Sequence, residues 1–102
     1  MPTATPPSLP SKERLILEIL ISTGPMFGLQ MVEASGGALK RGTVYVTLGR
    51  MEQKGFVTSE QEALPGGAIG LPRRRYRPTA LGERALRAWT TLARELAWGV
   101  TR

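Results

Sequence analysis

The chain has 102 residues and a formal net charge of +6 at pH 7, with 14 Lys and Arg against 8 acidic residues. This length fits one small domain. The sequence contains no His, Cys, Asp or Asn, which excludes Ser/His/Asp and Cys/His catalytic triads, thiolate or imidazole metal sites, and disulfides. No spacing of the glutamates predicts two carboxylates in one cleft, and no glycine-rich loop is followed by the lysine and hydroxyl of a phosphate-binding loop. We therefore predict that the protein is not an enzyme and has no catalytic residues, metal site or cofactor.

The positive charge is concentrated in the middle of the chain. Residues 40–77 carry a net charge of +5, whereas residues 1–39 carry −1 and residues 78–102 carry +2. A scattered charge of this size is common on a solvated surface, but its concentration in one segment favours a phosphate-binding surface.

The first ten residues contain four prolines and no apolar run. They predict a disordered arm and no signal sequence. The most apolar stretch, residues 15–21, is far shorter than the roughly 20 residues that span a bilayer. We expect a cytoplasmic protein that does not contact membranes.

The first predicted helix begins with Ser11 as its N-cap and runs to about Ser22. Glu13 lies in the first turn, where the helix dipole favours a negative charge. Apolar residues cover nearly the whole circumference, which predicts burial on more than one side. A glycine and a proline at 24–25 end this helix, and a short second helix is expected over about 27–34.

The third predicted helix starts near Gly42 or Thr43 and ends at Lys54, with Gly55 as a left-handed stop. Its apolar stripe has helical spacing and should face the core. This stripe consists of Val44, Leu48 and Met51. The opposite, outward face is small, polar and lightly basic, and consists of Thr43, Val46, Gly49, Arg50 and Gln53.

The periodicity changes after the third helix. Residues 56–60 and 73–77 are predicted strands, and the glycine-rich stretch 65–70 between them is the tip of a β-hairpin. Thr79 is a predicted cap for a final helix that runs to about Trp98. The apolar positions of this helix are Leu81, Ala85, Ala88, Leu92 and Leu96, with Trp89 and Ala93 beside them.

Three helices followed by a β-hairpin are typical of a winged helix-turn-helix, whose third helix enters the DNA major groove. We therefore predict a mainly α fold of the α+β class. The expected organisation is a proline-rich arm at 1–10, a winged helix-turn-helix domain at 11–78, and a C-terminal dimerisation helix at 79–102.

Residues 42–57, with the sequence GTVYVTLGRMEQKGFV, resemble the third-helix signature of the PadR family of bacterial transcriptional regulators. The strand around Tyr76, the Thr79 to Gly82 motif, the Gly24-Pro25 pair and Gly28 support the same resemblance. The resemblance covers residues 14–90 and is to the small subgroup with one dimerisation helix. It implies a transcriptional regulator that binds double-stranded DNA.

The candidate DNA-binding residues are Lys40, Arg41, Thr43, Tyr45, Val46, Arg50, Arg73, Arg74 and Arg75. Arg50 either pairs with Glu33 or Glu52, or contacts guanine O6 and N7. The three consecutive arginines either keep an exposed strand edge from pairing with another chain or bind DNA phosphates, and we favour phosphate binding. Thr43 could serve only as a helix cap, and Tyr45 only as an aromatic residue at the edge of the core. The resemblance to the PadR family implies instead that both residues contact DNA.

The main hypothesis is a homodimeric repressor on a pseudopalindromic operator. The candidate dimer interface consists of Leu15, Ile19, Leu81, Ala85, Trp89, Leu92 and Leu96. A small organic effector at this interface could alter the spacing of the two recognition helices. The alternative is a winged-helix module that binds a protein partner and no DNA.

Overall fold

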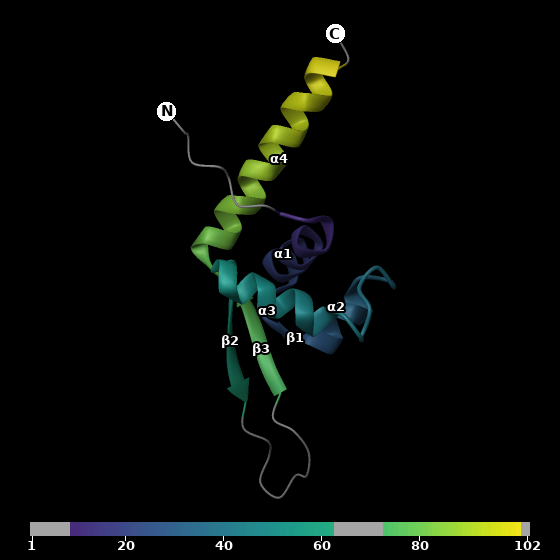
Figure 1. Cartoon of the computed structure of the whole chain (residues 1–102), viewed down its shortest axis with the longest axis vertical. Coiled ribbons are helices and arrows are strands. Elements are labelled where there is room, and N and C mark those ends of the chain that lie inside the picture. The colour runs from purple at the N-terminus through teal and green to yellow at the C-terminus, as the bar shows by residue number, and fades with distance from the viewer. Residues whose placement is uncertain (1–8, 63–72, 101–102) are drawn as a thin grey trace, which may run out of the picture.

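The computed structural model describes residues 9–62 and 73–100. This part of the chain contains four helices and three strands, so the predicted mainly α fold is confirmed (Figure 1). In chain order the elements are α1 (Ser11–Thr23), β1 (Met26–Phe27), α2 (Gly28–Ala34), α3 (Val44–Lys54), β2 (Val57–Glu62), β3 (Arg73–Pro78) and α4 (Ala80–Val100). Residues 1–8 of the predicted arm and the predicted hairpin tip at 65–70 lie outside the described residues.

Helix α1 forms the centre of the core. Its buried apolar residues are Ile16, Leu17, Ile19 and Leu20, but Ile21 is 43% exposed. The expectation of burial around nearly the whole helix was therefore too broad. The predicted N-cap is also wrong, because Pro10 holds the N-cap position and its carbonyl accepts a hydrogen bond from the Arg14 amide at 2.9 Å. Proline cannot donate from its own nitrogen, which suits the start of a helix.

The short strand β1 is absent from the prediction, which placed Phe27 in the second helix. Phe27 instead has an extended backbone, and its amide donates to Oε1 of Gln30 at 2.8 Å. This bond satisfies an amide that precedes the helix. Met26 and Phe27 pair with Tyr76 and Arg75 of β3.

The three strands form an antiparallel sheet in the order β1-β3-β2. The predicted hairpin is confirmed by the pairing of β2 with β3, in which Ser59 lies opposite Tyr76. Helix α3 begins at Val44, one or two residues later than predicted, and Gly55 ends it with the predicted left-handed backbone at φ 82°. The sheet and α3 close the core around Phe56, which is fully buried.

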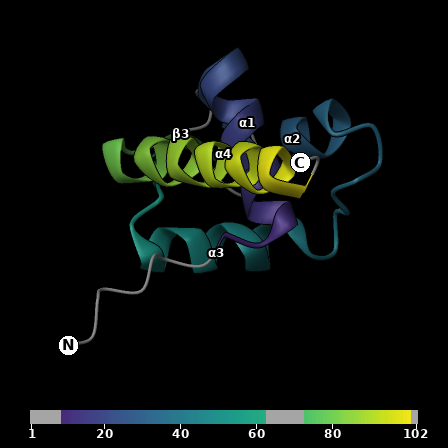
Figure 2. The same ribbon diagram turned by 90° about the horizontal axis from the view of Figure 1, so that it is seen from above.

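Helix α4 is attached to this body through its first turns. As predicted, Thr79 caps it, because the Thr79 Oγ1 accepts a hydrogen bond from the Gly82 amide at 3.0 Å. A Cβ on Gly82 would lie 2.2 Å from the Phe56 carbonyl oxygen, so only glycine fits this close approach. The helix crosses α1 and then extends away from the body (Figures 1 and 2). No helix within residues 9–62 and 73–100 is long and apolar enough to cross a membrane.

Candidate nucleic-acid interface

Helix α3 has one buried side and one open side. Val44, Leu48 and Met51 are at most 1% exposed, as the spacing predicted. The predicted outward residues are all exposed, namely Thr43, Val46, Gly49, Arg50 and Gln53. None of them is acidic, so this face can approach an anionic surface without charge repulsion.

The start of α3 combines cations with an exposed threonine. Lys40 and Arg41 are exposed directly before the helix. Thr43 holds the N-cap position, but its side chain makes no capping hydrogen bond. The Thr47 hydroxyl donates instead to the Thr43 carbonyl at 3.2 Å. Thr43 is thus a cap by position only, and its hydroxyl remains available to a ligand.

Tyr45 lies between the core and the surface. Its side chain is half-exposed, and its ring rests on Gly28 at the start of α2. A Cβ on residue 28 would be 2.6 Å from Cε1 of the Tyr45 ring. Gly28 therefore provides the space in which this ring sits.

Arg50 does not form either of the ion pairs considered from the sequence. Among the described residues, no carboxylate lies within ion-pair distance of its guanidinium. Glu52 instead accepts a hydrogen bond from the Ser59 hydroxyl at 2.8 Å. The guanidinium of Arg50 is therefore open to an external partner.

The consecutive arginines of β3 do not act as one cluster, because neighbouring strand residues point to opposite faces. Arg74 donates from Nε to the Ser59 hydroxyl at 3.0 Å. Arg73 and Arg75 lie on the other face, with their guanidinium carbons 4.3 and 4.9 Å from the centre of the Phe27 ring. Such cation–π contacts connect β1 to the wing.

Ion pairs neutralise some of the cations in residues 40–77, and the other cations have no ion-pair partner among the described residues. Arg75 pairs with Glu62 at 2.6 Å, and Arg77 pairs with Glu60 at 2.9 Å. Lys54 pairs with Glu13 at 2.9 Å. The cations that form no ion pair with a described residue are Lys40, Arg41, Arg50, Arg73 and Arg74. All of them are exposed, around α3 and on β3.

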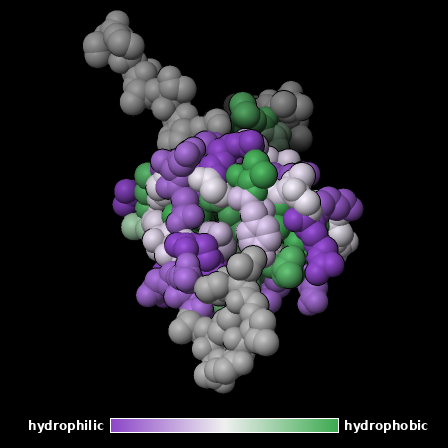
Figure 3. Space-filling model, turned by 60° about the horizontal axis from the view of Figure 1, so that its bottom comes forward, coloured by the Kyte–Doolittle hydropathy of each residue, from purple (hydrophilic) through white to green (hydrophobic). Residues whose placement is uncertain are grey.

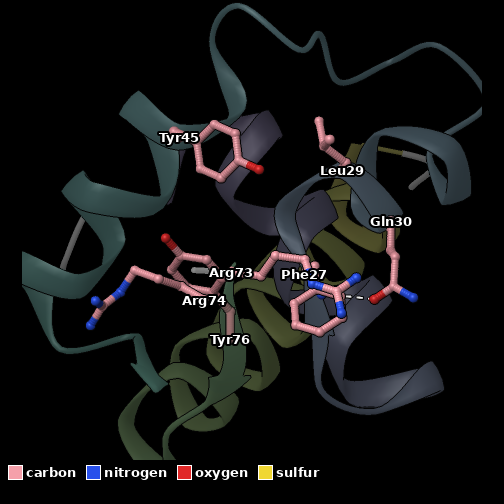
Figure 4. A pocket seen from close by; sticks show the side chains of 7 residues that line it. All are labelled: Phe27, Leu29, Gln30, Tyr45, Arg73, Arg74 and Tyr76. Carbon is pink, nitrogen blue, oxygen red and sulfur yellow. Dashed lines mark hydrogen bonds between the residues drawn. The ribbon is translucent and has the colours of Figure 1, made fainter. Parts of the chain in front are cut away.

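A hollow of about 540 Å³ opens between α2, α3 and β3 (Figure 4). Tyr45, Leu29, Gln30, Phe27 and Tyr76 surround it, together with Arg73 and Arg74. Burial raises the pKa of the Tyr76 hydroxyl above its ordinary value of 10.0, and the Glu52 carboxylate raises it further. Viewed from the wing side, hydrophilic side chains surround a smaller pale and hydrophobic area (Figure 3).

The part-buried ion pair between Glu13 and Lys54 is a structural feature that the sequence patterns did not predict. Glu13 is 1% exposed, and its Oε2 accepts no hydrogen bond within the described part of the chain. The pair joins the start of α1 to the end of α3 across 41 positions of sequence. No local spacing rule connects residues so far apart.

The predicted dimer residues differ in how far the single chain buries them. Leu81, Leu92 and Leu96 are exposed by 38, 54 and 60%. Leu15 and Ala85 are partly buried against the core, and Ile19 belongs to the core of a single chain at 8% exposure. Trp89 is half-buried, and the guanidinium carbon of Arg14 lies 3.8 Å from the centre of its ring.

A helical core, a helix α3 with an open face and a flanking β-hairpin define a winged helix-turn-helix protein. Residues 16–88 match the model of the transcriptional regulator PadR-like family. The chain belongs to this family, whose members are transcriptional regulators and not enzymes.

Individual relatives agree with this assignment. The transcriptional regulator Rv3488 of Mycobacterium tuberculosis is 40% identical over 74 residues, which cover 69% of this chain and 65% of the relative's length. A PadR family transcriptional regulator from Eggerthella lenta is 31% identical, with a TM-score of 0.70, over 86% of this chain and 76% of its own. Bacillus subtilis PadR in complex with operator DNA has a TM-score of 0.69 over 81% of this chain and 48% of its own; at 20% identity it supports the fold alone.

Proposed function

We propose that this protein is a sequence-specific, homodimeric regulator that binds double-stranded DNA and represses transcription from a pseudopalindromic operator. The observation that carries the proposal is the open face of α3, which has no acidic residue. This face carries Arg50 and is bordered by four more cations that, like Arg50, have no ion-pair partner among the described residues. Bacillus subtilis PadR, which shares this fold, forms a complex with operator DNA.

The residues on this surface have different expected roles. Arg50, Val46 and Thr43 lie on the open face and are the candidates for base edges in the major groove. The remaining side chains are candidates for phosphates, namely Lys40, Arg41, Tyr45, Arg73, Arg74 and Arg75. Arg75 must leave Glu62 to reach a phosphate, so we expect it to contribute least.

Helix α4 is the proposed dimerisation element, and residues 79–102 form a unit distinct from the DNA-binding domain at 11–78. Leu81, Leu92 and Leu96 are exposed along it, and an apolar stripe of this kind is best buried against a second copy. Leu15, Ala85 and Trp89 border this stripe in the proposal. A two-fold axis would then place the recognition helices about one turn of DNA apart.

A small organic effector between the two α4 helices is part of the same proposal, because it would change the spacing of the recognition helices. We also propose a cytoplasmic location, where the operator DNA would be.

The test is selection of bound duplexes from a random library, followed by anisotropy titrations of the enriched sequence. We expect two inverted half-sites, and an affinity that falls by about 10³ to 10⁵ between 50 and 200 mM salt if 6 to 10 phosphates are contacted. Failure to enrich any sequence, or binding that salt does not change, would refute the proposal. Copurification with an acidic protein and no DNA binding would instead favour the protein-interaction module.

A further inference from the structure

A chain of hydrogen bonds joins the last turn of α3 to the wing. The Ser59 hydroxyl donates to Oε2 of Glu52 at 2.8 Å and accepts from Nε of Arg74 at 3.0 Å. The strand register brings the two wing residues together, because Ser59 lies opposite Tyr76, and Arg74 is two positions earlier on β3 and projects from the same face. One hydroxyl therefore connects a carboxylate of the recognition helix to a cation of the wing.

These bonds engage only part of the Arg74 guanidinium. Its Nη1 donates to Oε1 of Gln61 at 3.4 Å, and no described residue accepts a hydrogen bond from its Nη2. Arg74 also forms no ion pair with a described carboxylate. The planar group is thus held at Nε, while its outer nitrogens can still donate to an anion.

We propose that Glu52 and Ser59 are positioning residues for DNA binding, which hold Arg74 in the orientation that meets a phosphate beside the recognition helix. The inference rests on the proposed function, in which Arg74 binds a phosphate. An exposed arginine side chain loses conformational freedom when it binds a ligand, and holding it beforehand reduces that cost. Glu52 therefore favours DNA binding, although its own charge repels a polyanion.

The sign of the Glu52 effect tests this role, in anisotropy titrations of the enriched duplex with the full chain. Charge alone predicts that removing a carboxylate near DNA raises the affinity. We expect Glu52→Ala instead to weaken binding by about threefold, because the Ser59 hydroxyl is no longer oriented with its lone pairs toward Arg74. Glu52→Gln keeps an acceptor oxygen and should bind at least as tightly as the unmodified protein.

Glu60→Ala is the matched control for the Glu52 variants. It also removes a wing carboxylate, but Glu60 pairs with Arg77 and takes no part in the bonds to Ser59. Its removal should leave the DNA affinity unchanged or raise it. A gain in Glu52→Ala like that in Glu60→Ala would overturn the proposal, as would an equal loss in Glu52→Gln and Glu52→Ala.

Ser59 gives a second test, with rescue by a conservative variant. Ser59→Ala removes the hydroxyl that holds Arg74 and should weaken DNA binding by about threefold to tenfold, whereas Ser59→Thr keeps a hydroxyl and should restore most of the affinity. Once Arg74→Ala is present, Ser59→Ala should cause no further loss, since the hydroxyl acts through Arg74. Urea unfolding of each variant checks that the fold is kept. Additive losses would contradict positioning through Arg74.

The closing experiment needs no DNA. Relaxation of ¹⁵N in the arginine Nε–H groups of the full chain reports their order, and Arg50, which has no ion-pair or hydrogen-bond partner among the described residues, is the internal control. We expect the Arg74 Nε–H to be more ordered than that of Arg50, and Ser59→Ala to remove the difference. An Arg74 as mobile as Arg50 would overturn the proposal. If Arg74 is ordered through Ser59 but no duplex binds, the proposed function fails while the hydrogen-bonded arrangement stands.

Discussion

The exposed face of α3 and the outer half of α4 have opposite chemistry. Helix α3 buries its apolar stripe within its own chain and turns small, polar and cationic residues to solvent. Helix α4 instead leaves Leu92 and Leu96 more than half exposed. Exposed leucines at helical spacing are costly in water, whereas exposed cations are not. The two surfaces therefore suit the different partners of the proposed function, a polyanion for α3 and an apolar surface for α4.

The difference arises from helix length relative to the core. Helix α3 has 11 residues and packs along its whole length, while α4 has 21 residues and touches the core mainly through its first half. Ala85 and Leu86 pack against the core, and the apolar stripe continues beyond the point where the core ends. The part of α4 beyond the core therefore has an apolar stripe that its own chain does not cover within the described residues, and this stripe is the proposed dimer interface.

The largest expected effect comes from removing the apolar character of α4. Replacing Leu92 and Leu96 together by Glu should leave the fold intact, because both side chains are exposed. It should abolish the dimer, and the loss of two-site binding should weaken operator affinity by about 100-fold or more. Sedimentation and anisotropy measure the two effects. Glu at Thr90 and Thr91, both exposed on the same helix, is the matched control. A double leucine variant that remains dimeric would contradict the comparison.

Two of the helical glycines, Gly82 and Gly49, give a second test, because Gly82 is sterically required and Gly49 is not. Gly82→Ala places a methyl group against the Phe56 carbonyl, and should lower the free energy of unfolding by about 3 kcal/mol. Gly49→Ala meets nothing within 4 Å on the open face of α3, and should raise it by about 0.5 to 1 kcal/mol. Urea unfolding measures both. A Gly49→Ala variant that is more stable yet binds operator more weakly would show that DNA approaches this backbone.

The third test separates base recognition from phosphate binding on the cationic surface. Arg50→Ala should cost about 1 to 3 kcal/mol of discrimination between the operator and a variant operator. Arg74→Ala should weaken both duplexes alike and reduce the salt dependence by about one phosphate. Arg77→Ala is the control, since its guanidinium pairs with Glu60. If Arg50→Ala weakened both duplexes equally, Arg50 would contact only the sugar-phosphate backbone of the DNA and no base.

The structure of α3 was predictable because its signals are local. Helical spacing of Val44, Leu48 and Met51 fixed the buried side, and Gly55 fixed the end. The open face followed from the same periodicity. The PadR-like family was predictable from the GTVYVTLGR segment, residues 42–50. In the fold this segment forms the start of α3 and contributes to both its buried and its open side.

Features that depend on distant residues were not predictable in the same way. Strand β1 has two residues and exists only because β3 pairs with it about fifty positions later. The Glu13 pair with Lys54 similarly depends on tertiary packing. Ser11 is a better cap than Pro10 by propensity, but the chain enters α1 one residue earlier. Strand alternation alone places the β3 arginines on two faces, but it does not show what each face contacts. Only the structure shows that Phe27 packs against the face that carries Arg73 and Arg75.

The smallest expected effect concerns Tyr76, which lies below the cationic surface at 5% exposure. Its raised pKa means that the neutral phenol is favoured in the folded state. This contribution to stability is fully present below the ordinary pKa of 10.0 and is lost as pH rises through the higher, folded-state pKa. Tyr76→Phe should therefore change the stability at pH 7 by about 0.5 kcal/mol or less and flatten its decline at alkaline pH. Urea unfolding at pH 8 and above pH 10 measures the slope. Tyr45→Phe, which removes a half-exposed hydroxyl, is the control, and an equal flattening there would contradict burial as the cause.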